Sequence, residues 1–187
     1  MSRRTRTALI GGVLVGSLLI MGAGFPTTKV PPKHWATGVC TAIGDWVNAS
    51  KTGADQLNTA LTGTRPKLRD VRELLSGYLG HTAHATTLAI DGLNRAGTPT
   101  TPKGNTAARA LTDSFKQIRS SLRHLQDTAD GVSIKHKAKA LKQLKSLNTD
   151  IGVEFSSFQK ALTKLQHLDP NHKLRKAFQA DAACQAL

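Results

Sequence analysis

Apolar side chains recur at steps of three and four residues along most of the chain, which is the spacing of one face of an α-helix. Four long segments follow this pattern: Pro32 or Lys33 to Leu61, residue 64 to Leu93, Asn105 or Thr106 to Asp130, and Ser133 to Leu168. A short fifth segment carries Leu174, Phe178 and Cys184. No strand pattern of alternating residues appears. The sequence therefore predicts an all-α protein, an antiparallel four-helix bundle with a short C-terminal fifth helix.

Glycine, proline and capping residues predict where these helices begin and end. Thr64 is a candidate N-cap of the second helix with Pro66 in its first turn, and Ser133 is a candidate N-cap of the fourth. Glycines in the first segment predict a kink or a break near Ser50–Gly53. The clearest loop is Ala96–Gly104, which holds two glycines and two prolines.

The N-terminal 28 residues differ from the rest of the chain. Three arginines (Arg3, Arg4 and Arg6) precede an uncharged run whose apolar centre is Ala8–Phe25. A basic stretch before an apolar run is typical of a secretory signal. As a helix the run would span about 27 Å, close to the roughly 30 Å of a bilayer core. We therefore expect a signal peptide or signal anchor over 1–28, and both a cleaved signal and a retained membrane anchor remain open.

The remaining chain divides into two parts. Three prolines follow the apolar run, so we expect residues 29–34 to form a Pro-rich spacer. Residues 35–187 are then the helical bundle domain. This length is sufficient for one domain with its own core.

The chain is strongly basic. It holds 26 lysines and arginines against 12 acidic residues, a formal charge of +14 at pH 7. Two sets of basic residues share helical faces and form a candidate anion-binding patch: Arg109, Lys116, Arg119 and Arg123 on the third helix, and Lys135, Lys139, Lys142 and Lys145 on the fourth. The alternative is a pair of solvated faces. Candidate partners are an anionic envelope polymer or lipid headgroups. Nucleic acid is disfavoured because no aromatic residues interleave with the basic ones.

Cys40 and Cys184 are the only cysteines. Two thiols in one exported domain usually pair, so we predict a disulfide between them. The bridge would close a loop of roughly 145 residues and stabilise the fold by about 5 kcal/mol on the chain-entropy treatment. It would tie the first helix to the last.

The two tryptophans lie on the first helix on either side of Cys40. We expect Trp35 and Trp46 to pack in the core beside the disulfide. The alternative for Trp35 is an anchor at the membrane interface.

No catalytic or metal-binding constellation stands out. His81 and His84 share a helical face, but two histidines make only a weak surface site. Ser157 with Lys160 and the run Lys51–Gly53 imitate motifs of penicillin-binding enzymes, but in reversed order and without the strand that those motifs need. We expect no metal, no cofactor and no enzymatic activity.

The stretch Val39–Trp46, together with Ala183–Leu187, resembles uncharacterised exported proteins of high-GC actinobacteria. That resemblance implies an N-terminal signal or anchor, a helical domain that opens with a cysteine and then a tryptophan, and a second cysteine near the C-terminus. Many such proteins are lipoproteins, whereas this chain lacks the lipidation cysteine. The resemblance implies no established activity.

These observations favour an extracytoplasmic, non-enzymatic bundle that interacts with other proteins or with the envelope. The first alternative is a module that binds an anionic polymer or a membrane surface through its Lys/Arg face. The second is a carrier of an apolar ligand or haem inside the bundle, which needs an internal cavity.

Overall fold

The computed structural model describes residues 28–63, 66–147, 149–150, 169 and 171–187. The helices are α1 (Pro32–Gly63), α2 (Leu68–Ala96), α3 (Gly104–Asp130), α5 (Lys173–Gln179) and α6 (Ala182–Gln185), with a further helical stretch over residues 137–147. Two strands of two residues each, β1 (Lys29–Val30) and β2 (Thr98–Pro99), complete the described structure. The all-α prediction is confirmed.

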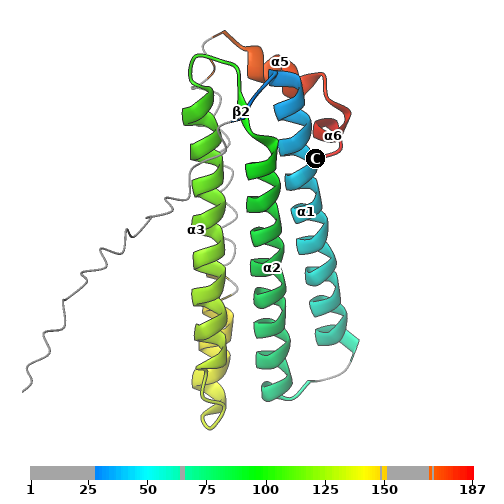
Figure 1. Ribbon diagram of the computed structural model, residues 1–187. Coiled ribbons are helices and arrows are strands. Elements are labelled where there is room, and N and C mark those ends of the chain that lie inside the picture. Colours follow the sequence, from blue (N-terminus) through cyan, green and yellow to red (C-terminus); the bar gives the residue numbers. More distant parts are fainter. Residues whose placement is uncertain (1–27, 64–65, 148, 151–168, 170) are drawn as a thin grey trace, which may run out of the picture.

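The three long helices run side by side, with α2 in contact with both α1 and α3 (Figure 1). Successive helices are antiparallel, because each connection turns the chain back at an end of the bundle. The short helices α5 and α6 lie against α1 at the end where α1 begins. The stretch 137–147 lies at the opposite end, beside the C-terminal part of α3.

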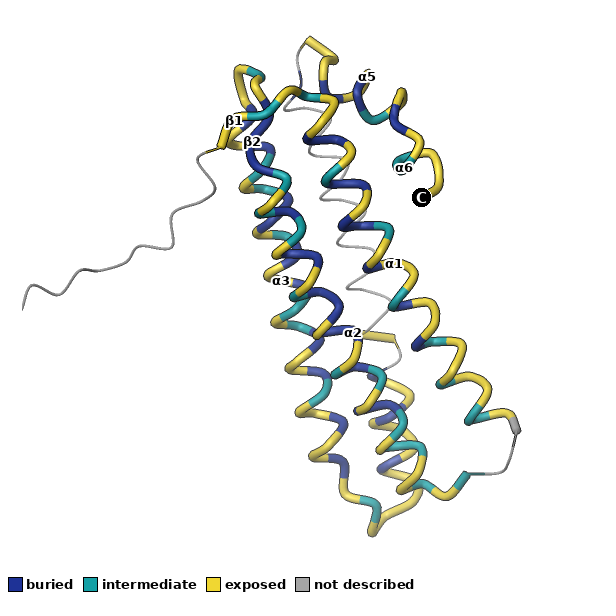
Figure 2. Tube along the Cα trace, turned by 45° about the vertical axis from the view of Figure 1, so that its right-hand side comes forward, coloured by how far each residue is buried: buried dark blue, intermediate teal, exposed yellow. Residues whose placement is uncertain are grey.

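The core is a continuous cluster formed by the apolar faces of these helices. Figure 2 shows it as buried positions, in dark blue, that recur along each long helix. Phe115 and Leu79 are fully buried at its centre. The Trp46 ring packs edge-on against Phe115 with centroids 5.2 Å apart, and its Nε1–H donates to Thr86 Oγ1 at 2.9 Å. The indole therefore links all three long helices, with its only polar atom satisfied.

Two glycines, Gly53 in α1 and Gly92 in α2, serve close packing and do not break either helix. At Gly92 an added Cβ would lie 2.7 Å from the Cβ of Ala42, and at Gly53 it would lie 3.2 Å from the Tyr78 ring. A break near Ser50–Gly53 is excluded, because α1 is one continuous helix. The missing side chain there makes room for the neighbouring helix.

Several predicted boundaries shift by a few residues. Pro66 precedes α2 and does not lie in its first turn, because the N-cap is Lys67, whose N–H donates to the Asp70 carboxylate at 3.1 Å. Ser133 does not cap the fourth helix, since residues 134–136 form a turn and the helix begins at 137. Thr64 and the expected continuation to Leu168 lie outside the described residues. The single short C-terminal helix proves to be two, α5 and α6.

The predicted spacer and the predicted loop meet each other. Lys29 and Val30 pair in parallel with Thr98 and Pro99, and the Thr100 N–H donates to the Val30 carbonyl at 2.9 Å. Helix α1 begins at Pro32. Residues 29–34 are therefore part of the folded end of the domain, because β2 supplies the backbone partners that an extended spacer would lack.

Candidate functional site

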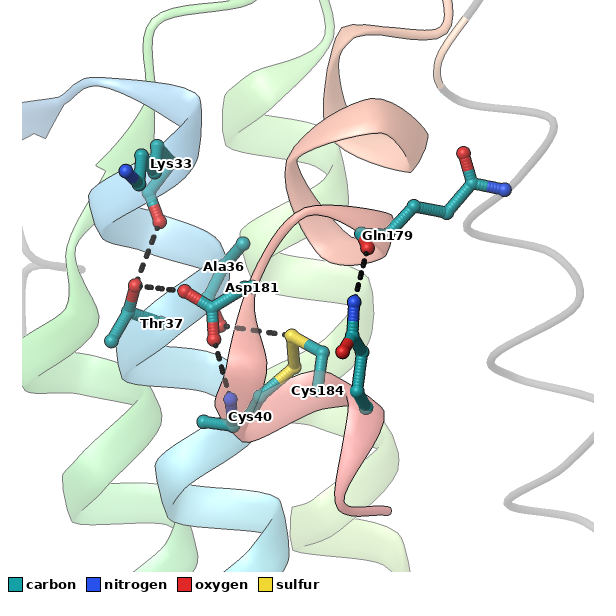
Figure 3. Close-up of a disulfide and its surroundings, with 9 residues drawn as sticks. Lys33, Ala36, Thr37, Cys40, Gln179, Asp181 and Cys184 are labelled. Atoms are coloured by element: carbon teal, nitrogen blue, oxygen red, sulfur yellow. Dashed lines mark hydrogen bonds between the residues drawn. A yellow bond between two sulfur atoms is a disulfide. The ribbon is translucent and has the colours of Figure 1, made fainter.

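The disulfide predicted from the sequence is present, and it closes the C-terminal end of the chain onto α1. Cys40 and Cys184 are bonded, with their Cα atoms 5.0 Å apart (Figure 3). Cys40 is 2% exposed, and Cys184 lies on α6, which contacts α1. The bond therefore cross-links the first long helix to the short C-terminal helix.

Two further contacts hold the same junction. The Thr37 hydroxyl of α1 donates to the Asp181 carboxylate, whose other oxygen caps α6 by accepting from the Ala183 N–H at 3.0 Å (Figure 3). The Trp35 ring packs edge-on against Phe178 of α5 with centroids 5.7 Å apart.

Trp35 is 1% exposed, so it is a core residue and its ring is not available as a membrane anchor.

The expected anion-binding patch divides into two unlike parts. Its first four members lie on α3: Arg109, Lys116, Arg119 and Arg123. Asp113, Asp127 and Asp130 lie along the same helix, so α3 carries four basic and three acidic residues. Lys116 Nζ lies 3.1 Å from Asp113 Oδ1. We call this set the mixed stripe, because nearby carboxylates offset most of its positive charge.

The second part is more strongly charged. Between Asp130 and Asp150 the chain holds no acidic residue and five exposed lysines, which we call the lysine segment: Lys135, Lys137, Lys139, Lys142 and Lys145. Within the helical stretch the buried positions are Ala140, Leu144 and Leu147. Helical geometry places Lys139, Lys142 and Lys145 on the opposite, solvent-facing side. Lys135 precedes the helix and does not share this face through helical periodicity, contrary to expectation.

A third group of basic residues was missed by the sequence analysis. Six exposed cationic side chains lie at the end of the bundle where α1 begins, and we call them the basic end: Lys29, Lys33, Lys103, Lys173, Arg175 and Lys176. They come from β1, α1, the residue before α3, and α5. Lys173, Arg175 and Lys176 are close together in the sequence, but they join the other three residues only when α5 folds back onto α1.

The histidines and the motif fragments gain no support as sites from the geometry. His81 and His84 are exposed on α2, and no group of three or more metal-ligating residues occurs within the described part of the chain. Lys51, Thr52 and Gly53 lie inside the continuous helix α1. Ser157 and Lys160 lie outside the described residues.

Several hollows that are lined entirely by described residues open at the surface between the helices. Two lie along the α1–α2 seam, with volumes of about 630 Å³ beside Trp46 and about 570 Å³ beside Tyr78. A third, of about 510 Å³, is lined by α3, Leu147 and Asp150. Open hollows of this kind leave a bound apolar ligand or haem in contact with water.

Tyr78, which lines one of these hollows, has a shifted pKa. Burial raises the pKa of Tyr78 above its usual value, while a hydrogen bond with Thr82 opposes this effect.

No protein family, curated protein or solved structure matches this chain. Across the residues that the structure describes, no helix is both long enough and apolar enough to cross a membrane. The apolar run Ala8–Phe25 lies outside those residues. Functional assignment therefore depends on the disulfide, on the distribution of charge and on the N-terminal sequence.

Proposed function

We propose that this chain is an extracytoplasmic, non-enzymatic helical-bundle protein that acts as an interaction module of the cell envelope. The observation that carries the proposal is the disulfide between Cys40 and Cys184. Structural disulfides form and persist in oxidising compartments outside the cytoplasm. The bond joins residues 144 positions apart and closes α6 onto α1, so it is built into the native arrangement.

The N-terminal sequence supports the same compartment. Three arginines followed by Ala8–Phe25 would direct the chain across a membrane, either as a cleaved signal or as a retained anchor. A fourth helix that continues beyond residue 150 would complete an antiparallel four-helix bundle, which would lie on the extracytoplasmic side of the membrane. The resemblance of Val39–Trp46 to exported actinobacterial proteins fits this placement.

The test is fractionation of cells that make the full chain, combined with thiol labelling and mass measurement. We expect wild-type protein outside the cytoplasm with no free thiol, and its mass will distinguish cleavage from retention. Leu14→Arg with Leu18→Arg interrupts the apolar run and should leave the protein in the cytoplasm with both thiols reduced. Leu14→Ile with Leu18→Ile is the matched control. Wild-type protein that stays in the cytoplasm with labelled thiols would refute the proposal.

A second candidate function, binding of an anionic envelope polymer, is favoured by the lysine segment. Its five lysines lack any interleaved acid, whereas the mixed stripe is close to neutral. Contact with a phosphate polymer would release counterions, so affinity should fall steeply as salt rises.

This second candidate can be tested with inorganic polyphosphate as the probe. Lys139→Glu with Lys142→Glu should weaken binding at least tenfold and reduce its dependence on salt. Arg109→Glu with Lys116→Glu, the control in the mixed stripe, should have a smaller effect. Binding that ignores salt, or that survives the change at Lys139 and Lys142, would exclude polymer recognition by the lysine segment.

A further inference from the structure

The basic end differs from the rest of the surface because its acidic residues are buried. Asp169 accepts a hydrogen bond from the Arg175 N–H at 2.9 Å, and Asp181 is bonded to Thr37 and Ala183. Both aspartates are less than 8% exposed. Both carboxylates are used to cap the short helices, and their two negative charges leave the six exposed cations of the basic end with an excess of four positive charges.

The nearest exposed carboxylate on a long helix lies further along the bundle. Asp91 on α2 is five residues before the helix ends at Ala96, about 7.5 Å along the axis. Arg95 follows one turn later, between Asp91 and the end of the helix. The potential at the basic end therefore stays positive.

The polypeptide also enters the domain at this end, in a fixed position. The Thr98 N–H donates to the carbonyl of Thr28, the residue directly before β1, at 3.0 Å. Gly97 has a φ of +77°, and a Cβ there would lie 2.8 Å from the same carbonyl oxygen. Residues from Thr28 onward are thus bound to the domain and do not act as a flexible spacer.

This attachment sets the distance between the basic end and the apolar run. Phe25, the last residue of the run, precedes Thr28 by three residues, which span at most about 10 Å. That distance is close to one Debye length in physiological salt. The lysine segment lies at the other end of α3, whose 27 residues extend about 40 Å. Only the basic end stays within electrostatic reach of a bilayer that holds the run.

We propose that the basic end is a membrane-docking surface that binds the anionic headgroups of the bilayer from which the chain emerges. This inference builds on the proposed export of the chain and applies where the apolar run is retained. Docking would hold the long helices away from the bilayer, with the lysine segment at the distal end. The module would then present its second basic surface to the space beyond the membrane.

The surface can be tested without depending on export. The probe is a set of vesicles of equal parts phosphatidylglycerol and phosphatidylcholine, compared with vesicles of phosphatidylcholine alone. The protein is the full chain with Leu14→Ser, Leu18→Ser and Leu19→Ser, which stop the run from inserting. We expect binding to the anionic vesicles only, and a decline in binding as salt rises.

Two variants remove charge from different elements of the basic end. Lys173→Gln, Arg175→Gln and Lys176→Gln together should weaken vesicle binding about 100-fold, at roughly fivefold for each side chain. Lys29→Gln, Lys33→Gln and Lys103→Gln should do the same without altering α5. Circular dichroism and thermal unfolding establish that each variant is folded.

The matched control is Lys139→Gln, Lys142→Gln and Lys145→Gln, which removes three charges from the lysine segment. Vesicle affinity unchanged in this control, with losses in both basic-end variants, supports the proposal. Equal losses in all three variants would mean unspecific attraction and would overturn it. Loss of polyphosphate binding but not of vesicle binding in the basic-end variants would also overturn it, since the partner would then be a soluble polymer. Failure of export in the cell would leave the vesicle result unaffected, so the two proposals fail separately.

Discussion

Removing the disulfide should destabilise the protein without changing its fold. The perturbation is Cys40→Ala with Cys184→Ala, which deletes the cross-link and leaves no buried hydroxyl. In the folded state α5 and α6 keep their other contacts with α1, including the Trp35–Phe178 ring pair and the Thr37–Asp181 hydrogen bond. The variant is therefore expected to retain native helix content, and its loss of stability should act through the unfolded chain.

The expected magnitude follows from the length of the closed loop. The bonded residues are 144 positions apart, almost the whole of the domain. The chain-entropy relation gives about 17 cal/mol/K for a loop of this size, or about 5 kcal/mol at 25 °C. For a domain of roughly 150 residues this corresponds to a fall in melting temperature of about 10–20 °C.

The assay is urea unfolding followed by circular dichroism and by tryptophan fluorescence. Trp35 and Trp46 lie in different parts of the core, so coincident transitions would indicate two-state unfolding. The m-value of the variant should exceed that of the oxidised protein, because an uncross-linked unfolded chain exposes more surface. Wild-type protein treated with reductant is the matched control and should behave like the variant.

A loss of less than about 1 kcal/mol with an unchanged m-value would refute the reasoning, since the bond would then not restrict the unfolded chain. A biphasic transition in which Trp35 fluorescence changes first would also refute it. In that case the bond would act in the native state, by preventing α5 and α6 from detaching.

Two further predictions follow from individual side chains. Tyr78 is the only tyrosine, and its raised pKa means that the folded protein holds the phenol proton more tightly than the unfolded chain does. The contribution of Tyr78 to the free energy of unfolding should therefore be fully present below the unfolded pKa of about 10, and it should decline as pH rises from there through the folded pKa. Tyr78→Phe should flatten this decline, and tyrosinate absorbance should show a midpoint above 10; a midpoint at or below 10 would contradict the reasoning. Gly92→Ala should destabilise the protein by about 1 kcal/mol, because its Cβ would meet that of Ala42 at 2.7 Å. Gly77→Ala, where nothing lies within 4 Å, should instead stabilise it by about 0.5–1 kcal/mol, and urea unfolding that gave both variants the same sign would contradict the packing.

The amino-acid pattern was sufficient to predict the long helices and the disulfide. The three- and four-residue spacing of apolar side chains predicted α1, α2 and α3 to within a few residues, because helix burial depends mainly on a single face. The pairing of Cys40 with Cys184 followed from their number and from the predicted compartment. Glycine was less informative: Gly53 weakened the helical pattern, yet the helix continues because the glycine makes room for Tyr78.

The amino-acid sequence by itself determined the helical class, the cysteine pair, the total charge and the apolar N-terminal run. Each of these depends on residue type or on neighbours within a few positions. The contrast between the mixed stripe and the lysine segment also follows from the sequence positions of the acidic residues. Only the tertiary structure assembled the basic end, because the packing of α5 against α1 brings together residues as far apart as Lys29 and Lys176. It also showed that Lys29 and Val30 pair with β2 and do not form a spacer. These features depend on contacts between distant segments, and such contacts exist only when the buried faces of the helices have packed together.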